Sequence, residues 1–198
     1  MARADSVTNP QAGRTPLAER LFATRRLTLD LAAPLSDADA TIQPFADASP
    51  AKWHLAHTTW FFETFVLRDH VRNYEAFDER FAFLFNSYYE AEGQRHARPK
   101  RGMLSRPTLD EVRDWRRQVD EALDRALPNL TPEALDLIEL GINHEQQHQE
   151  LLLTDILPAF AENPMEPAYA QLGPPACYAT EKLTFHPGRT GIVEIGAR

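Results

Sequence analysis

The sequence predicts an all-α protein in which four long helices, with one or two shorter helical pieces, form an antiparallel bundle. Apolar residues recur at helical spacing along four segments, near residues 16–35, 50–68, 108–127 and 132–160. Three of these segments begin with a Ser or Thr cap, at Ser49, Thr108 and Thr131. Nothing upstream of the last segment reads as a strand, so packing helix on helix is the expected way to bury the apolar faces.

The chain is expected to begin with a short disordered lead-in followed by the first helix of the bundle. Residues 1–14 are polar and interrupted by proline and glycine, which disfavours regular structure. We place the bundle at residues 15–163, with an amphipathic helix from Pro16 to about Leu35. A loop with several aspartates, residues 36–49, follows it.

The second helix is predicted to be buried. Ser49 is expected to be its N-cap and Pro50 to occupy its first position, and the helix runs to about Arg68. Aromatic residues on more than one side are typical of a helix surrounded by others. Residues 74–92 are rich in Phe and Tyr and predict a helix or a helix with breaks, and a basic loop at residues 93–102 follows.

The last two long helices have clear start signals. Thr108 and Glu111 form a capping box, which predicts a helix to about Leu127. Thr131, followed by proline, predicts the start of a helix that reaches about Phe160.

The chain changes character after Pro158, where five prolines mark an extended connector. Thr190–Gly196 reads as a strand that has no partner in this sequence. We therefore expect residues 164–198 to form a linker and the first strand of a truncated second domain.

Bulk composition excludes several classes of protein. The 198 residues carry a formal net charge of -8 without long basic runs, so we expect no nucleic-acid partner. No apolar run is long enough for a membrane span, and no signal peptide is apparent, so we expect no membrane partner. The single cysteine, Cys177, suits a reducing compartment and is expected to be an incidental loop residue. Together these features predict a cytoplasmic protein.

The strongest chemical signal is a pair of histidines in the last helix. His144 and His148 are four residues apart, so both imidazoles lie on one face and can reach one metal ion. A catalytic metal needs at least one more ligand, and His54, His57 and Asp155 are candidates. Spacing alone does not choose between His54 and His57; the neighbouring aromatic residues favour His57, and His54 is better interpreted as a hydrogen-bonded core histidine.

The same segment also matches the zinc-peptidase pattern, in which a glutamate after the first histidine activates water. We disfavour that interpretation because no sheet precedes the helix. Glu145 falls instead in line with the apolar residues Ile138, Ile142 and Leu152. A carboxylate in such a stripe more often orients a ligand or bonds to a neighbouring helix.

Three separated stretches resemble the family of the ergothioneine biosynthesis protein EgtB, the iron-dependent sulfoxide synthases. They are Ser49–Thr64 (SPAKWHLAHTTWFFET), Phe85–Glu90 (FNSYYE) and Asn143–Glu150 (NHEQQHQE). The resemblance covers roughly residues 15–198. It implies an N-terminal DinB-like four-helix bundle and a C-terminal domain of the sulfatase-modifying type, of which residues 185–196 look like the opening.

The resemblance implies specific site residues and substrates. It places iron ligands at His57, His144 and His148, with Fe(II) as the cofactor, although three histidines by themselves suit zinc equally. It implies that Arg95 and Arg98 bind the carboxylate of the thiol substrate and that Gln147 contacts hercynine. A solvated basic loop remains the alternative for the two arginines. The implied reaction uses O2 to join the sulfur of γ-glutamylcysteine, or of cysteine, to hercynine.

Three other functions remain open at the level of sequence. The related ovothiol-forming synthases share the architecture but use histidine itself, and the Ser49–Glu63 stretch favours the ergothioneine branch. A DinB-like metal-dependent thiol transferase is a different enzyme class. A truncated bundle that only binds metal or docks a partner would have no activity.

Overall fold

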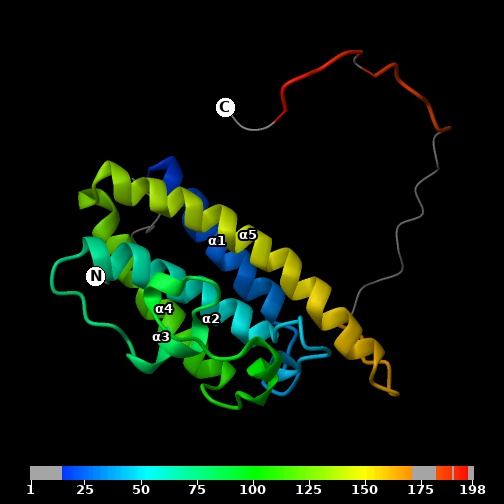
Figure 1. The fold of residues 1–198 in the computed structure, drawn as a ribbon, viewed down its shortest axis with the longest axis horizontal. Helices are drawn as coiled ribbons and strands as arrows, with labels where there is room; N and C mark the ends of the chain where they lie inside the picture. The colour runs from blue at the N-terminus through cyan, green and yellow to red at the C-terminus, as the bar shows by residue number, and fades with distance from the viewer. Residues whose placement is uncertain (1–14, 171–181, 189, 196–198) are drawn as a thin grey trace, which may run out of the picture.

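The computed structural model describes residues 15–170, 182–188 and 190–195, and all regular structure in these ranges is helical (Figure 1). The α-helices are α1 (Pro16–Ala32), α2 (Ala51–Phe62), α3 (Arg80–Phe85), α4 (Leu109–Ala126) and α5 (Pro132–Ala161). A π-helical segment, Glu63–Arg68, continues α2. Short 3-10 helices occupy Asp39–Thr41, Glu90–Glu92, Arg98–Met103 and Leu127–Asn129. The predicted all-α class is confirmed.

The four long helices form two parallel pairs that run in opposite directions. On α1 and α5, Arg20 bonds to Glu139 and, further along both helices, Thr28 bonds to Gln149, so these neighbours are parallel. His57 of α2 lies beside His144 of α5, whereas the earlier residue His54 of α2 bonds to the later residue His148 of α5. The order is reversed between the two helices, so α2 is antiparallel to α5.

The fourth long helix, α4, is antiparallel to α1 and therefore runs in the same direction as α2. Its first residue, Leu109, bonds to Asp37 just beyond the end of α1, whereas Asp120, further along α4, pairs with Arg25 in the middle of α1. Parallel helices cannot be joined by a short turn, so residues 69–108 must cross from one end of the bundle to the other. This crossover segment, green in Figure 1, contains α3 and the basic loop.

The first helix begins at Pro16 as predicted, and the predicted N-caps are confirmed at Thr108 and Thr131 but wrong at Ser49. Thr108 and Glu111 form the reciprocal capping box at the start of α4, and Thr131 caps α5 through the backbone N–H of Ala134. At α2 the N-cap is Pro50, without a side-chain cap bond. Ser49 instead accepts a hydrogen bond from Arg101, because a non-local guanidinium competes for its hydroxyl.

Several predicted boundaries differ from the structure. The first helix ends at Ala32, three residues early, and only Arg80–Phe85 of residues 74–92 forms an α-helix. The last helix continues through Pro158 to Ala161. A proline so near the C-terminal end removes only one intrahelical hydrogen bond, and the Pro158 carbonyl still accepts from Glu162 to close the last turn.

The strand predicted at residues 190–196 was expected to have no partner in this sequence, and it stays a prediction. Residues 190–195 form no ladder with any described part of the chain, and a strand needs a hydrogen-bonded partner to be stable. The second domain stays a prediction. The lead-in at residues 1–14 and Cys177 lie outside the described residues.

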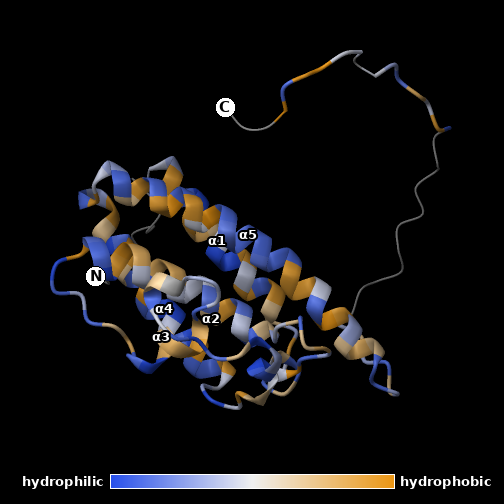
Figure 2. Ribbon diagram, in the orientation of Figure 1, coloured by the Kyte–Doolittle hydropathy of each residue, from blue (hydrophilic) through white to orange (hydrophobic). Residues whose placement is uncertain are grey.

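The predicted burial of the second helix is confirmed. Every residue of α2 is buried, because α1, α4, α5 and the crossover segment pack around it. Figure 2 shows both apolar and polar residues along the long helices, and the buried apolar residues of α4 recur at helical spacing. No helix in the described ranges combines the length and apolar character needed to cross a bilayer.

Gly141→Ala is expected to destabilise the fold by about 1–3 kcal/mol. A Cβ atom at Gly141 would lie 2.5 Å from Cε1 of Phe62 and 3.0 Å from Cε1 of Phe61, both on α2. Urea denaturation measures the effect, with Asn143→Ala, at an exposed position on the same helix, as control. A gain of about 1 kcal/mol, as helix propensity alone predicts, would contradict this close approach.

Candidate metal centre

Three histidines meet between α2 and α5. His57 is buried in α2, and His144 and His148 lie one turn apart on α5, partly buried. One potential ligand atom from each residue lies within 4.8 Å of those of the other two. The ring centroids are 4.6–5.0 Å apart. The structure therefore brings together the three residues predicted as metal ligands.

The hydrogen bonds of these rings suit a metal ion. Nδ1 of His57 lies 2.6 Å from the carbonyl oxygen of Phe85, which only accepts, so Nδ1 carries the proton and Nε2 has a lone pair. The buried Nδ1 of His144 has no hydrogen-bond partner among the described residues. An unsatisfied buried nitrogen is costly unless a ligand such as a metal ion completes its bonding.

The electrostatic surroundings keep the rings neutral, which is the form that binds metal. Burial lowers the pKa of His144 to about 4. Burial and the adjacent imidazoles hold the pKa of His57 and of His148 well below the ordinary value. Three neutral imidazoles converging on one point fit a divalent transition metal such as iron or zinc.

The metal-free protein is expected to lose stability as pH falls from about 7 toward 4. A histidine in the unfolded chain binds a proton near pH 6.5, whereas the pKa of folded His144 is about 4. Between these values the unfolded state binds more protons, so each such histidine costs about 1.4 kcal/mol of stability per pH unit. Urea denaturation across this range measures the slope. His144→Asn should make it shallower; an equal slope would contradict the assignment.

His54 has a different arrangement from the three clustered histidines. Its Nδ1 lies 2.8 Å from Nδ1 of His148, and its Nε2 lies 3.1 Å from a carboxylate oxygen of Asp155. The same oxygen accepts the backbone N–H of Ser49. Both ring nitrogens of His54 are thus engaged, as expected of a hydrogen-bonded core histidine.

A cavity of about 350 Å³ opens beside the histidines. The indole of Trp53 stacks on His57 with centroids 4.5 Å apart, which gives the cavity an aromatic wall. Polar and charged groups line the rest, and the full lining is Ser49, Trp53, His54, His57, Ser87, Tyr88, Tyr89, Arg98, Arg101, His144, His148, Leu151 and Asp155. The cavity combines a possible metal centre with groups that can bind an anion.

Arg101 is the main lining residue that sequence reasoning missed. Its guanidinium lies 3.4 Å from the centroid of Trp53 and donates hydrogen bonds to Ser49 and Ser87. Burial, with Arg98 nearby, lowers the pKa of Arg101 to about 9, so it remains a cation that a bound carboxylate would stabilise. The sequence shows the basic loop, but it does not show that a 3-10 turn buries Arg101.

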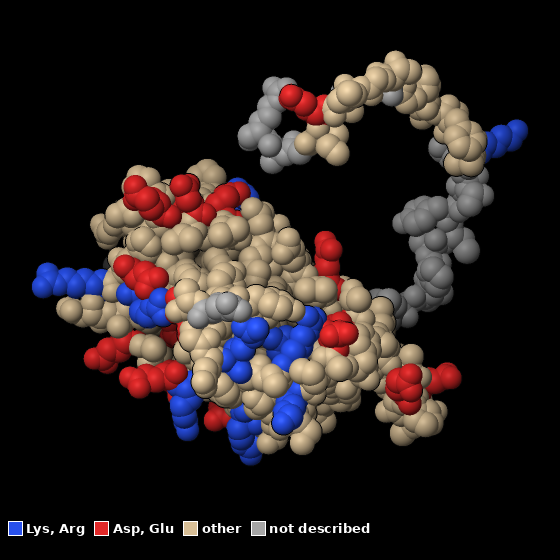
Figure 3. All heavy atoms as spheres, in the orientation of Figure 1, with Lys and Arg blue, Asp and Glu red and all other residues tan. Residues whose placement is uncertain are grey.

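Figure 3 shows Lys and Arg side chains gathered on the face formed by the crossover segment, although the whole chain is acidic. Among the predicted substrate-binding residues, Arg98 lines the cavity and donates to the Tyr88 hydroxyl at 2.6 Å. Arg95 is exposed and lies over the Tyr88 ring, outside the cavity lining. Gln147 is exposed on α5 and does not line the cavity either.

Glu145 does not reach the cavity. It is fully buried on another face of α5, where it pairs with Arg25 and Arg116 and accepts from Thr28 at 2.6 Å. A glutamate held by two guanidiniums away from the histidines cannot act as the general base of a zinc peptidase. The structure therefore excludes that interpretation.

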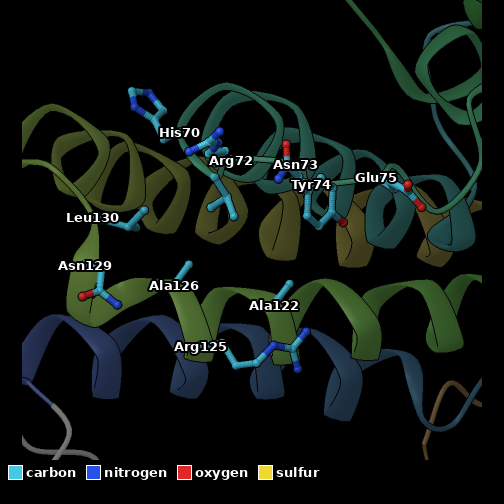
Figure 4. Close-up of a pocket in the computed structure, with 11 residues that line it drawn as sticks. His70, Arg72, Asn73, Tyr74, Glu75, Ala122, Arg125, Ala126, Asn129 and Leu130 are labelled. Atoms are coloured by element: carbon cyan, nitrogen blue, oxygen red, sulfur yellow. The ribbon is translucent and has the colours of Figure 1, made fainter.

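Figure 4 shows a second cavity, of about 510 Å³, between residues 70–75 and the end of α4. Its one histidine, His70, points outward from it. In the described ranges, the histidine centre is the single group of three or more potential metal ligands. The second cavity therefore does not compete with it as a metal site.

The fold and the site define a class: a helical bundle with a three-histidine centre capable of holding a metal ion. The sequence pattern of the DinB superfamily matches residues 20–152, a range that contains all three histidines. The chain belongs to the DinB superfamily. No curated protein matches this chain.

Proposed function

We propose that this chain is the iron-binding bundle of an ergothioneine-type sulfoxide synthase and that His57, His144 and His148 hold Fe(II). The observation that carries the proposal is the convergence of the three stretches that resemble that family. Ser49–Thr64 supplies His57, Asn143–Glu150 supplies the other two histidines, and Phe85–Glu90 contributes lining residues to the same cavity. Residues far apart in the chain thus meet in one place.

The proposed reaction joins a thiol to C2 of the hercynine imidazole. One C–S bond and one S–O bond form, one S–H and one C–H bond break, and O2 takes up four electrons and leaves its second oxygen as water. When bound, Fe(II) would supply the electron-transfer chemistry that lets O2 react with the thiol, and would lower the thiol pKa.

The protein's own residues would bind and orient the substrates. Three neutral imidazoles from two helices occupy one side of the centre and leave the cavity side for substrate. Arg98 and Arg101 present guanidinium groups suited to the carboxylates of γ-glutamylcysteine or cysteine. Trp53 stacks on His57 and limits access of water to that ring.

A second candidate is a metal-dependent thiol transferase of the DinB type. The match to the DinB superfamily favours it, because that match includes all three histidines. Such an enzyme would form a thioether without consuming O2. The two candidates therefore differ in their products.

An anaerobic Fe(II) titration followed by γ-glutamylcysteine, hercynine and O2, with products read by mass spectrometry, tests the proposal. A sulfoxide conjugate that requires O2 supports it. A thioether formed without O2 favours the transferase. Iron binding without product would assign the chemistry to residues outside this chain, and absence of iron binding would contradict the proposal.

Arg98→Ala is expected to weaken binding of the thiol substrate about tenfold or more while the metal stays bound, because it removes a charge-assisted hydrogen bond to the carboxylate. Calorimetry of γ-glutamylcysteine with the metal-loaded chain measures this. Arg95→Ala should have a smaller effect, since Arg95 lies outside the lining. Arg113→Ala, on the surface of α4, is the control. Equal affinities for Arg98→Ala and Arg113→Ala would refute the role of Arg98.

A further inference from the structure

A continuous chain of hydrogen bonds connects the backbone of Ser49 to His148. The N–H of Ser49 donates to Oδ2 of Asp155 at 2.8 Å, and the same oxygen lies 3.1 Å from Nε2 of His54. Nδ1 of His54 then lies 2.8 Å from Nδ1 of His148. These hydrogen bonds join the start of α2 to the side of α5 that carries His148.

The chemistry of these groups determines where each proton lies. The carboxylate of Asp155 only accepts, so Nε2 of His54 must donate to it. A buried His54 beside Arg101 and three other imidazoles is neutral, so its Nδ1 has a lone pair and accepts from Nδ1–H of His148. A neutral imidazole has one proton, which leaves Nε2 of His148 with the lone pair.

We propose that His54 and Asp155 are positioning residues that hold His148 in the Nδ1–H tautomer, so that its Nε2 is available to a metal ion. This inference rests on the proposed metal centre and extends it to two residues that contact no metal themselves. His57 has the same Nδ1–H tautomer with a different partner, because the carbonyl oxygen of Phe85 accepts a hydrogen bond from its Nδ1. Partners of this kind orient the ring and strengthen its basicity toward metal.

Two measurements on the full chain test the proposal. In the metal-free protein, long-range ¹H–¹⁵N correlation spectra of the imidazoles should show His148 protonated on Nδ1. In His54→Phe, which removes the acceptor, the Nε2–H tautomer should become populated and Zn²⁺ affinity should fall about tenfold to a hundredfold. His54→Asn should rescue both readouts, because its amide oxygen can accept from His148.

Tyr74→Phe is the matched control, since it removes one partly buried hydrogen bond, to Glu63, away from the histidines. It should leave the His148 tautomer and Zn²⁺ affinity unchanged. A wild-type His148 protonated on Nε2 would overturn the proposal, as would unchanged tautomer and affinity in His54→Phe. If His54→Phe does not fold, the wild-type tautomer decides. If the wild-type chain binds no Zn²⁺, the proposed metal centre is wrong. The tautomer of His148 still tests the positioning role of His54 and Asp155 independently.

Discussion

His144→Ala and His148→Ala are each expected to abolish stoichiometric Fe(II) binding while the bundle remains folded. Each change removes one of three ligands, and two imidazoles alone hold a divalent ion weakly. The fold should tolerate the loss because both side chains border the cavity and neither belongs to the apolar core. Anaerobic titration with Fe(II) at micromolar protein measures the stoichiometry, and circular dichroism confirms the helices.

Other histidines provide the controls for this experiment. His96→Ala, in the crossover segment, should bind iron as the unchanged chain does, because His96 lies outside the centre. His54→Ala should keep one-to-one stoichiometry with a weaker affinity, because His54 acts through His148. Loss of the metal in His54→Ala combined with its retention in His57→Ala would show that the ligand set is wrong.

Glu145→Ala is expected to lower the free energy of unfolding by about 3–5 kcal/mol. Glu145 is fully buried and forms ion pairs with Arg25 of α1 and Arg116 of α4, which are buried as well. Burial by itself would raise the pKa of Glu145, but the two guanidiniums outweigh it and lower that pKa. Without this carboxylate, the two cations would lose a shared counter-charge in the bundle interior.

Glu139→Ala is a matched control for that prediction. Glu139 is also on α5 and pairs with an arginine of α1, Arg20, but both side chains are about half exposed, at 45% and 54%. Exposed pairs contribute about 0–1 kcal/mol. Urea denaturation at neutral pH compares the two variants. Equal losses of stability would show that the buried network does not carry the expected energy.

Much of the fold could be predicted because its signals are local. The capping box at Thr108, the Thr131 cap and the apolar period of α5 act within a few residues of chain. The boundaries were less accurate where a distant group intervened. At Ser49, the hydroxyl expected to cap α2 is bound by Arg101, which is 52 residues away.

The metal site likewise has one part that local sequence signals predict and another part that depends on distant contacts. The spacing of His144 and His148 already places both rings on one face of a helix. In the sequence, neighbouring aromatic residues and a resemblance favour His57 over His54 as a ligand. The physical reason is visible only in three dimensions, because both ring nitrogens of His54 already have hydrogen-bond partners. The expectation for Gln147 has no support in the cavity lining.

The sequence by itself determined the helical class, the starts of α1, α4 and α5, and the histidine pair, because these depend on interactions between residues within one or two turns. Only the tertiary structure decided that α1 runs parallel to α5, that residues 69–108 must cross the bundle, and that Arg101 is buried beside the histidines. These features depend on contacts between segments far apart in the chain, whose energies come from packing and desolvation and are not encoded in any local pattern.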